Sequence, residues 1–157
     1  QDQTFLELGA GNGLISISAA KHGAQVTASD ISELVVKTLK QNALDNNVSI
    51  QIIKSDLFNQ IPKQTFDIIA INPPYYPKQA RNDLEMAWYC GVNFEYFQAL
   101  FSQIKDYMDT SSLVLMVLSD GCDIPKITSI AKTNGLSFTL FHQQKIWWEK
   151  EFIFRIQ

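Results

Sequence analysis

Phe5-Leu6-Glu7-Leu8-Gly9-Ala10-Gly11-Asn12-Gly13 is the stretch that decides the fold. Its first half reads as a buried strand, and its second half has a glycine at every other position. Glycines allow positive φ and let a ligand approach the backbone closely. The amphipathic segment Leu14 to Lys21 follows, and a helix that begins there presents free N–H groups at its N-terminus. The stretch therefore predicts a strand, a glycine-rich turn and a helix, the first unit of a parallel α/β sheet.

The spacing of the glycines indicates what kind of cofactor the turn could bind. A dinucleotide-binding turn has the pattern G-x-G-x-x-G, whose third glycine falls here at Leu14. NAD therefore fits poorly. The form G-x-G-x-G, with Glu7 just before it, suits a cofactor that carries an amino acid and a nucleoside.

The next strand also ends in a polar group. Ala24 to Asp30 reads as a second strand, and its final carboxylate lies 21 positions after Gly9, where it could accept hydrogen bonds from both ribose hydroxyls. A plainer alternative is that Asp30 only caps the helix that begins near Ser32.

A third strand, Val48 to Lys54, runs into Ser55-Asp56-Leu57. Asp56 could accept from an adenine amino group and Leu57 could pack on the ring, although Asp56 could also simply start a turn. Three consecutive strands that each end in a polar group at one edge of a parallel sheet favour ligand binding, because open α/β sheets bind ligands at that edge.

A fourth apolar run, Asp67 to Ile71, ends abruptly in Asn72-Pro73-Pro74-Tyr75. Proline fixes φ and has no N–H, so the strand must stop here. The Asn72 side-chain oxygen and the Pro73 carbonyl are then two acceptors that can hold a planar NH2 group, on which Tyr75 could stack. The alternative is an ordinary turn, since Asn and Pro are common in turns.

These motifs resemble those of class I S-adenosylmethionine-dependent methyltransferases, and among them the HemK-type enzymes that methylate protein glutamine side chains. The resemblance covers nearly the whole chain. It implies a Rossmann-like α/β fold, with a seven-stranded, mostly parallel sheet, an antiparallel last strand and helices on both faces. The cofactor it implies is S-adenosyl-L-methionine, which leaves as S-adenosyl-L-homocysteine.

The resemblance also assigns roles to particular residues. It implies catalytic roles for Asn72, Pro73 and Tyr75, and substrate binding by these three together with Pro74. The residues that it assigns to the cofactor are Glu7, Gly9, Ala10, Gly11, Gly13, Asp30, Ile31, Asp56, Leu57 and Asn72.

The segment Leu84 to Asn93 narrows the choice of methyl acceptor. It is similar to the acidic, Ala-Trp and Gly-x-Asn pattern of short HemK-like proteins. This likeness favours a glutamine in a protein such as a translation release factor, whose Gly-Gly-Gln loop would carry it. Adenine methyltransferases of RNA and DNA share the Asn-Pro-Pro-Tyr motif and remain the alternative. Such proteins usually have a segment before the glycine motif, so we expect residues 1–157 to be a single methyltransferase domain that lacks an N-terminal segment.

The composition favours a protein acceptor over nucleic acid. The chain has 13 basic and 16 acidic residues, and the basic ones are scattered, whereas nucleic-acid enzymes usually neutralise phosphates with clustered Lys and Arg. No apolar run is long enough to span a membrane and no residues have metal-ligand spacing, so we expect a cytoplasmic enzyme without a metal. Cys90 and Cys122 read as reduced packing residues. A small partner subunit is a further expectation.

The remaining segments continue the alternation of helices and strands. Ser32 to Asn46 and Asn93 to Met108 read as helices, the latter with an apolar stripe, and Ser112 to Ser119 as a strand. Ile124 to Asn134 reads as a helix closed by Gly135, and Leu136 to Gln143 as a sixth strand. The last segment, Lys145 to Gln157, is expected to form an antiparallel hairpin with it, in which Trp147 and Trp148 serve as core or edge packing. The predicted stripe consists of Phe94, Phe97, Leu100, Phe101 and Ile104.

Overall fold

The computed structural model describes residues 2–157 and contains one seven-stranded sheet with the strand order β3-β2-β1-β4-β5-β7-β6. The chain divides into two compact units. The first extends through Ile71 and includes Asp106–Leu113, and the second consists of Asn72–Lys105 and Val114–Gln157. The mostly parallel sheet with an antiparallel strand near its end confirms the fold class expected from the sequence.

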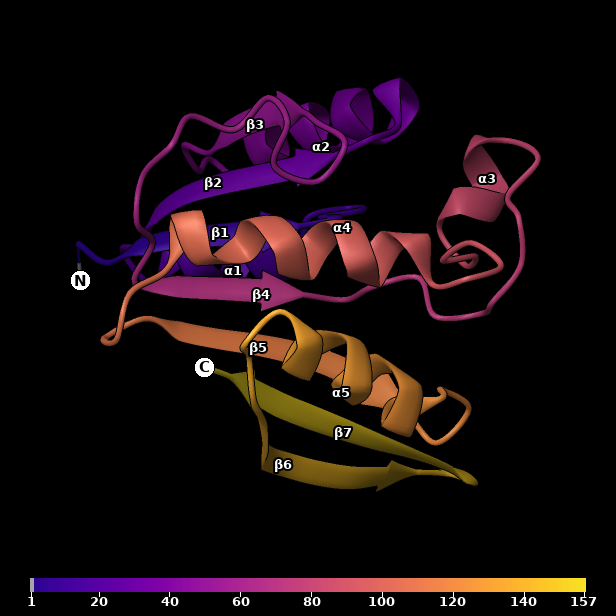
Figure 1. Ribbon diagram of the computed structural model, residues 1–157. Helices are drawn as coiled ribbons and strands as arrows, with labels where there is room; N and C mark the ends of the chain where they lie inside the picture. The colour runs from indigo at the N-terminus through magenta and orange to yellow at the C-terminus, as the bar shows by residue number, and fades with distance from the viewer. Residues whose placement is uncertain (1) are drawn as a thin grey trace. The chain divides into compact units, whose positions relative to one another are not determined.

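The first unit is a parallel α/β arrangement in which β3, β2, β1 and β4 lie side by side (Figure 1). Helix α1 packs on β1 and β2, and helix α2 packs on β2 and β3. The central strands β1 and β2 are almost continuously buried, as expected for strands of a parallel sheet. The elements are β1 (Thr4–Leu8), α1 (Leu14–Lys21), β2 (Gln25–Asp30), α2 (Glu33–Asp45), β3 (Gln51–Lys54) and β4 (Ile68–Ile71).

A polar clasp sets the register at the amino end of this unit. Thr4 donates to the Asp67 carboxylate from both its backbone N–H, at 2.7 Å, and its hydroxyl, at 2.9 Å. The backbone N–H of Asp67 donates in return to the Thr4 hydroxyl at 2.9 Å. The clasp holds β1 and β4 together just before Phe5 pairs with Ile68.

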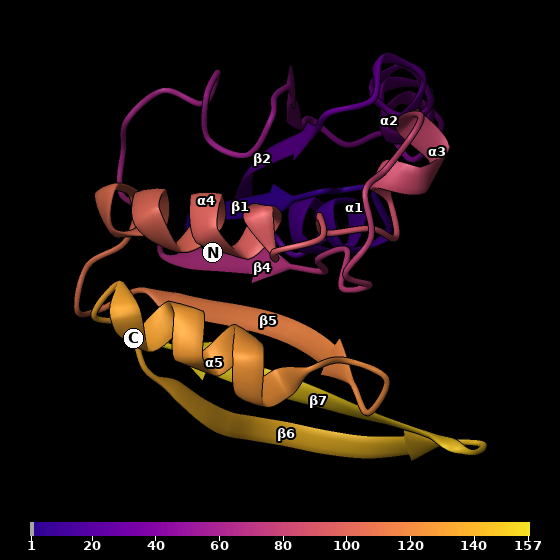
Figure 2. The same cartoon turned by 45° about the vertical axis from the view of Figure 1, so that its right-hand side comes forward.

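The second unit is built on the antiparallel strand β7, which pairs with β5 on one side and β6 on the other. Helix α5 lies along this part of the sheet in both Figure 1 and Figure 2, and α4 packs against α5. The elements are α3 (Asp83–Met86), α4 (Glu95–Gln103), β5 (Leu113–Ser119, whose first residue belongs to the first unit), α5 (Ile124–Thr133), β6 (Phe138–Ile146) and β7 (Glu149–Ile156). The 3-10 turn η1 (Ile104–Tyr107) is divided between the two units.

The predicted apolar stripe is confirmed, because each of its five residues is less than 8% exposed. From it, Phe101 meets Phe138 of β6 edge-on, and Phe138 in turn contacts Phe154 of β7. The stripe is therefore the core of the second unit. Helix α5 ends as expected, at Asn134 followed by Gly135, whose φ of +69° suits glycine.

The expectation for the two tryptophans was wrong. Trp147 and Trp148 form the two-residue turn between β6 and β7, and they are 80% and 82% exposed. A register shift between Leu140 and His142 also interrupts the alternation of β6. Simple strand alternation therefore could not locate the turn or the buried side of this hairpin.

Candidate functional site

Strand register brings the predicted polar groups of the first unit to one edge of the sheet. Leu8, the last residue of β1, pairs with Ser29 of β2 and with Ile71, the last residue of β4. The chain therefore leaves β1 and β4 at the same level, and Gly9 and Asn72 are the next residues there. Asp30, the last residue of β2, lies one position beyond Ser29 at the same edge. Adjacent strands in a sheet lie about 4.8 Å apart.

The glycine turn is held by hydrogen bonds from both sides. Asp30 accepts from the backbone N–H of Gly11 at 3.1 Å through one oxygen, and from the N–H of Ser32 at 3.0 Å through the other. The N-cap of α2 is Ser32, so Asp30 binds the backbone of the capping residue and does not cap the helix itself, as the plainer alternative had it. Asp30 also fixes the glycine turn. Each of its oxygens keeps a further lone pair that can accept from a ligand hydroxyl.

Glu7 is buried, and its contact identifies a residue that the sequence analysis missed. One of its carboxylate oxygens accepts from both the backbone N–H of Ser16, at 2.9 Å, and the Ser16 hydroxyl. Burial raises the pKa of Glu7, the Ser16 hydrogen bonds oppose that rise, and the charge of Asp30 adds to it. Glu7 therefore ties β1 to the first turn of α1. A serine on the inner side of a short apolar helix was the available signal.

The glycines of this turn differ in what surrounds them. Gly13 has φ +82°, and a Cβ there would lie 2.1 Å from a terminal methyl of the buried Leu39 side chain, so both the backbone and the packing disfavour a side chain at this position. Gly11 has φ +54°, and a Cβ there would meet nothing within 4 Å. The space beside Gly11 is therefore open, which fits a turn that a cofactor approaches at the backbone.

The third strand places its predicted residues at this edge as well. The carbonyl of Leu57 accepts from the Ser55 hydroxyl at 2.7 Å. The backbone of Leu57 has φ +47°, a conformation that residues other than glycine rarely adopt. Leu57 is half-buried, whereas Asp56 and Ile31 are exposed. These positions leave an apolar group and a carboxylate accessible, which suits an adenine ring.

The Asn72-Pro73-Pro74-Tyr75 motif begins directly after β4. Asn72 is exposed, Pro73 is buried, and Pro74 and Tyr75 are half-buried. Within the described residues, no protein group hydrogen-bonds the Asn72 amide. The Asn72 side chain is thus accessible to a ligand.

Tyr75 lies beside Ser119, the last residue of β5, and its ring contacts Tyr76 at 4.7 Å between centroids. Burial raises the pKa of the Tyr75 hydroxyl, whereas its hydrogen bond to Ser119 opposes the rise. Tyr75 is therefore a neutral phenol at physiological pH. Ser119 was missed by the sequence analysis, although it ends a strand as the other site residues do.

The segment after the motif forms a closed loop. Tyr76 and Tyr89 make an isolated parallel bridge, and Arg81 pairs with Glu85 at 2.6 Å. A Cβ on Gly91, at φ +87°, would lie 2.0 Å from a Glu95 carboxylate oxygen. The glycine of this pattern thus makes room for Glu95, which also accepts from the backbone of Asn93 at 2.9 Å.

The two cysteines are both free. Burial raises the pKa of Cys90 to about 11, so this thiol is un-ionised at neutral pH. Among residues 2–157 no cluster of His, Cys, Asp and Glu could hold a metal ion. Of the helices in the same range, none has the length and apolarity needed to cross a lipid bilayer.

A family model described as "Methyltransferase small domain" matches residues 1–89, which hold the glycine turn, Asp30 and the Asn-Pro-Pro-Tyr motif. The chain belongs to this methyltransferase family. The match confirms the resemblance found in the sequence.

Relatives that are similar in sequence to this chain are also named as methyltransferases. A provisionally named protein N5-glutamine methyltransferase of Methanocaldococcus jannaschii is 46% identical over 78 residues, which are 49% of this chain and 39% of the relative. The release factor glutamine methyltransferase of Streptococcus pneumoniae is 36% identical over 125 residues, 78% of this chain and 42% of the relative. The chain thus spans about two fifths of the length of these relatives.

Among solved structures, the E. cuniculi Mtq2-Trm112 complex, described as responsible for methylation of the eRF1 translation termination factor, matches with a TM-score of 0.72 and 16% identity. The match covers 100% of this chain and 85% of that one. At this identity the likeness establishes the fold alone.

Proposed function

We propose that this chain transfers a methyl group from S-adenosylmethionine to the side-chain amide nitrogen of a glutamine in a translation release factor. The register that pairs Leu8 with Ile71 carries the proposal. It makes Gly9 and Asn72 the residues that follow paired positions of adjacent parallel strands, so a cofactor-binding turn and an acceptor motif begin at the same edge.

The residues of the first unit fit S-adenosylmethionine. The open space beside Gly11 admits the cofactor to the backbone, and Asp30 offers carboxylate lone pairs to the ribose hydroxyls. Asp56 and Leu57 provide an acceptor and an apolar surface for adenine. Bound there, the cofactor supplies a methyl group made electrophilic by the sulfonium charge.

The residues after β4 would orient and activate the acceptor. The lone pair of an amide nitrogen is delocalised into its carbonyl, and the rotation barrier of about 18–20 kcal/mol shows how strong that resonance is. When the Asn72 side-chain oxygen and the Pro73 carbonyl accept the two N–H hydrogens, they raise electron density on nitrogen. They also stabilise the positive charge that develops there.

No strong base is required, because the proton becomes acidic only as the new N–C bond forms, and it can then leave to water. The neutral Tyr75 ring would pack on the planar amide. Holding the reacting atoms at near-attack distance could supply roughly 7–11 kcal/mol of the barrier. The two prolines make the motif rigid enough for such positioning.

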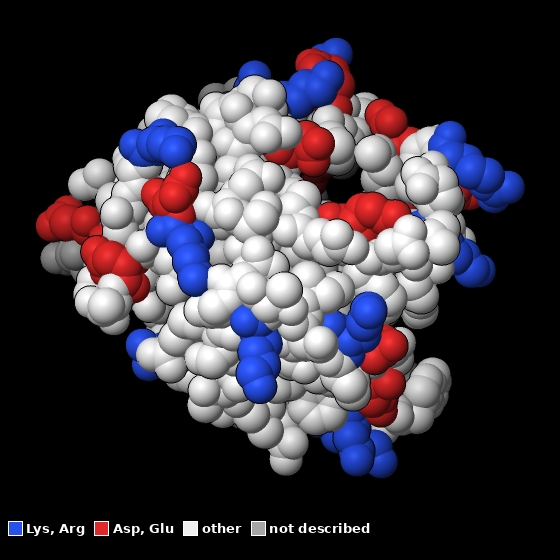
Figure 3. Space-filling model, viewed as in Figure 1, with Lys and Arg blue, Asp and Glu red and all other residues white. Residues whose placement is uncertain are grey.

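The acceptor is assigned to a protein because relatives from M. jannaschii and S. pneumoniae are named as glutamine methyltransferases, and because the basic residues are scattered along the sequence. On the face shown in Figure 3, Lys and Arg lie singly or beside Asp and Glu. A small partner subunit is also proposed, by analogy with the Trm112 subunit of the Mtq2 complex.

The test offers labelled S-adenosylmethionine with a release factor that carries the Gly-Gly-Gln loop, with structured RNA and with duplex DNA. Label is expected in the release factor, on the glutamine nitrogen. Replacement of that glutamine by alanine is the matched control. Incorporation into RNA or DNA instead would overturn the choice of acceptor.

A further inference from the structure

The turn between β6 and β7 consists of two tryptophans whose side chains are exposed. Trp147 and Trp148 are 80% and 82% exposed, and their rings meet edge-on with centroids 5.5 Å apart. Exposed apolar surface of this size is unfavourable in water. It commonly marks a site of interaction with another molecule.

The fold does not require tryptophan at this turn. Trp147 has φ +59°, a conformation that glycine and asparagine adopt readily and bulky residues rarely do. Two-residue hairpin turns accordingly favour Gly, Asn and Asp. The tryptophans therefore occupy a place where a smaller residue would make a more stable turn, and a backbone outlier of this kind points to function.

The strands next to the turn bring two lysines together. Lys145 and Lys150 are directly opposite each other in the antiparallel pair, which is unfavourable for like charges. Within the described residues neither lysine has an ion-pair partner. Gln144 and Glu151 hydrogen-bond to each other at 2.8 Å, and they lie one register step away.

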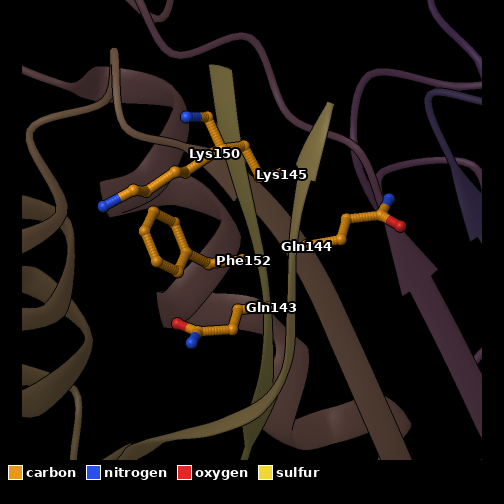
Figure 4. Close-up of a pocket in the computed structure, with 5 residues that line it drawn as sticks. All are labelled: Gln143, Gln144, Lys145, Lys150 and Phe152. Atoms are coloured by element: carbon orange, nitrogen blue, oxygen red, sulfur yellow. The ribbon is translucent and has the colours of Figure 1, made fainter. Parts of the chain in front are cut away.

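These side chains border a hollow. A cavity of about 200 Å³ is lined by Lys145, Lys150, Phe152 and two glutamines, Gln143 and Gln144. Figure 4 shows both lysines, Gln143 and Phe152 on one side of the hairpin, whereas Gln144 points to the other. The hollow thus combines two cations, an amide and an aromatic ring.

The turn lies at the end of the second unit where the acceptor motif is. Ser119 pairs with Glu151, and Tyr75 lies beside Ser119. Trp148 is three residues beyond Glu151, and a strand rises about 3.3 Å per residue, so the turn extends roughly 10 Å past the end of β5. A macromolecule that presents a side chain at Tyr75 has surface at that distance, whereas a free small acceptor does not.

We infer that Trp147, Trp148, Lys145, Lys150 and Phe152 form a docking surface for the acceptor protein, and that they bind a segment with a carboxylate next to an apolar side chain. The inference rests on the proposed function, because it takes the acceptor to be a protein. The lysine pair binds the carboxylate, and the tryptophans supply the aromatic contact area that dominates many protein interfaces.

A protein fits this surface better than nucleic acid. Polynucleotides are held by a series of phosphate contacts along a basic stripe. Here there is a single pair of lysines, and Lys150 is flanked by Glu149 and Glu151 in a chain with a net charge of −3. That arrangement recognises one anionic group and repels a continuous line of them.

The experiment measures methylation of an intact release factor and of a short peptide that contains only its Gly-Gly-Gln loop. The double variant Trp147→Gly/Trp148→Asn is expected to raise KM for the intact factor roughly tenfold, the loss typical of removing central aromatic contacts. KM for the peptide and Kd for S-adenosylmethionine are expected to stay unchanged. The melting temperature is expected to stay the same or rise, because the new turn residues suit the backbone.

The charge is tested with Lys145→Glu and Lys150→Glu, each of which should also raise KM for the intact factor alone. Matched controls are Lys132→Glu on α5 and Leu44→Ala on α2, which remove an exposed lysine and a 70% exposed apolar side chain elsewhere. Neither control should change KM.

The outcomes separate the two proposals. If wild type methylates the factor and the hairpin variants do so with the same KM, the docking surface is wrong and the proposed function stands. If wild type methylates neither factor nor peptide, the proposed function is wrong. In that case calorimetry measures the affinity of the release factor for wild type and for the hairpin variants. Equal affinities would show that the docking surface is wrong. Binding to polyuridylate that is lost in the variants would assign the surface to nucleic acid and overturn the inference.

Discussion

Asp30 accepts a hydrogen bond from the backbone N–H of Gly11 at 3.1 Å, and so joins the end of β2 to the turn that follows β1. The same carboxylate holds the N–H of Ser32 at the start of α2. One side chain thereby fixes two backbone segments while it keeps lone pairs for a ligand. This edge of the sheet is therefore preorganised by contacts within the protein.

Replacing Asp30 tests this double role. Asp30→Ala is expected to raise Kd for S-adenosylmethionine at least tenfold and to lower the free energy of unfolding by about 1–3 kcal/mol, because it removes charge-assisted hydrogen bonds. Asp30→Asn keeps an acceptor oxygen, so it should lose less cofactor affinity and less free energy of unfolding. Calorimetry and denaturant unfolding measure the two effects. An unchanged Kd in Asp30→Ala would remove this residue from the cofactor site.

Substitutions at two glycines of the turn should separate effects on protein stability from effects on cofactor binding. Gly13→Ala places a Cβ 2.1 Å from the Leu39 side chain at φ +82°, and we expect it to lower the free energy of unfolding by about 2–3 kcal/mol. Gly11→Ala is the matched control, because its Cβ enters open space at φ +54° and adds only strain of about 1–2 kcal/mol.

Cofactor binding should show the difference at Gly11. Since the Cβ of Gly11→Ala would occupy the space proposed for S-adenosylmethionine, its Kd is expected to rise more than tenfold, a loss of about 1.4 kcal/mol or more. A Gly11→Ala variant that binds the cofactor like wild type would show that the open space serves another purpose.

The buried pair of Glu7 and Ser16 predicts a pH-dependent loss of stability. The folded-state pKa of Glu7 is raised by burial, so its contribution to stability is complete below its unfolded pKa and is lost as pH rises through the folded value. Ser16→Ala removes the hydroxyl that opposes this rise and therefore raises the Glu7 pKa further.

We expect Ser16→Ala to lower the free energy of unfolding by about 1–3 kcal/mol at pH 7 and by less near pH 4, where Glu7 is protonated in both states. Denaturant unfolding at the two pH values measures this difference. Ser18→Ala, at an exposed position of the same helix, is the control and should show no pH dependence. Equal losses for Ser16→Ala at both pH values would mean that Glu7 does not carry the effect.

Asn72→Ala tests the acceptor site. It removes one of the two proposed acceptors, and we expect kcat to fall by about 10²–10³, as for other single groups that stabilise developing charge. Kd for S-adenosylmethionine should stay within about twofold, a difference of roughly 0.4 kcal/mol. Single-turnover kinetics and calorimetry make the comparison. Unimpaired turnover would exclude Asn72 from the chemistry.

The sequence alone determined the parts of the molecule that depend on local pattern. The sequence predicts turns at Gly9 to Gly13 and at Asn72 to Pro74. Glycine frees the backbone and proline restricts it wherever these residues occur. The stripe from Phe94 to Ile104 identified a buried helix face because burial follows helical periodicity.

The tertiary structure alone decided which groups meet. Asp30 contacts Gly11 and Ser16 contacts Glu7 across 19 and nine positions of the chain, and no local pattern encodes such pairs. Trp147 and Trp148 form a turn because β6 pairs with β7 through a register shift, and that register results from packing over the whole sheet. Local propensity fixes what each segment can become, whereas long-range packing selects its partners.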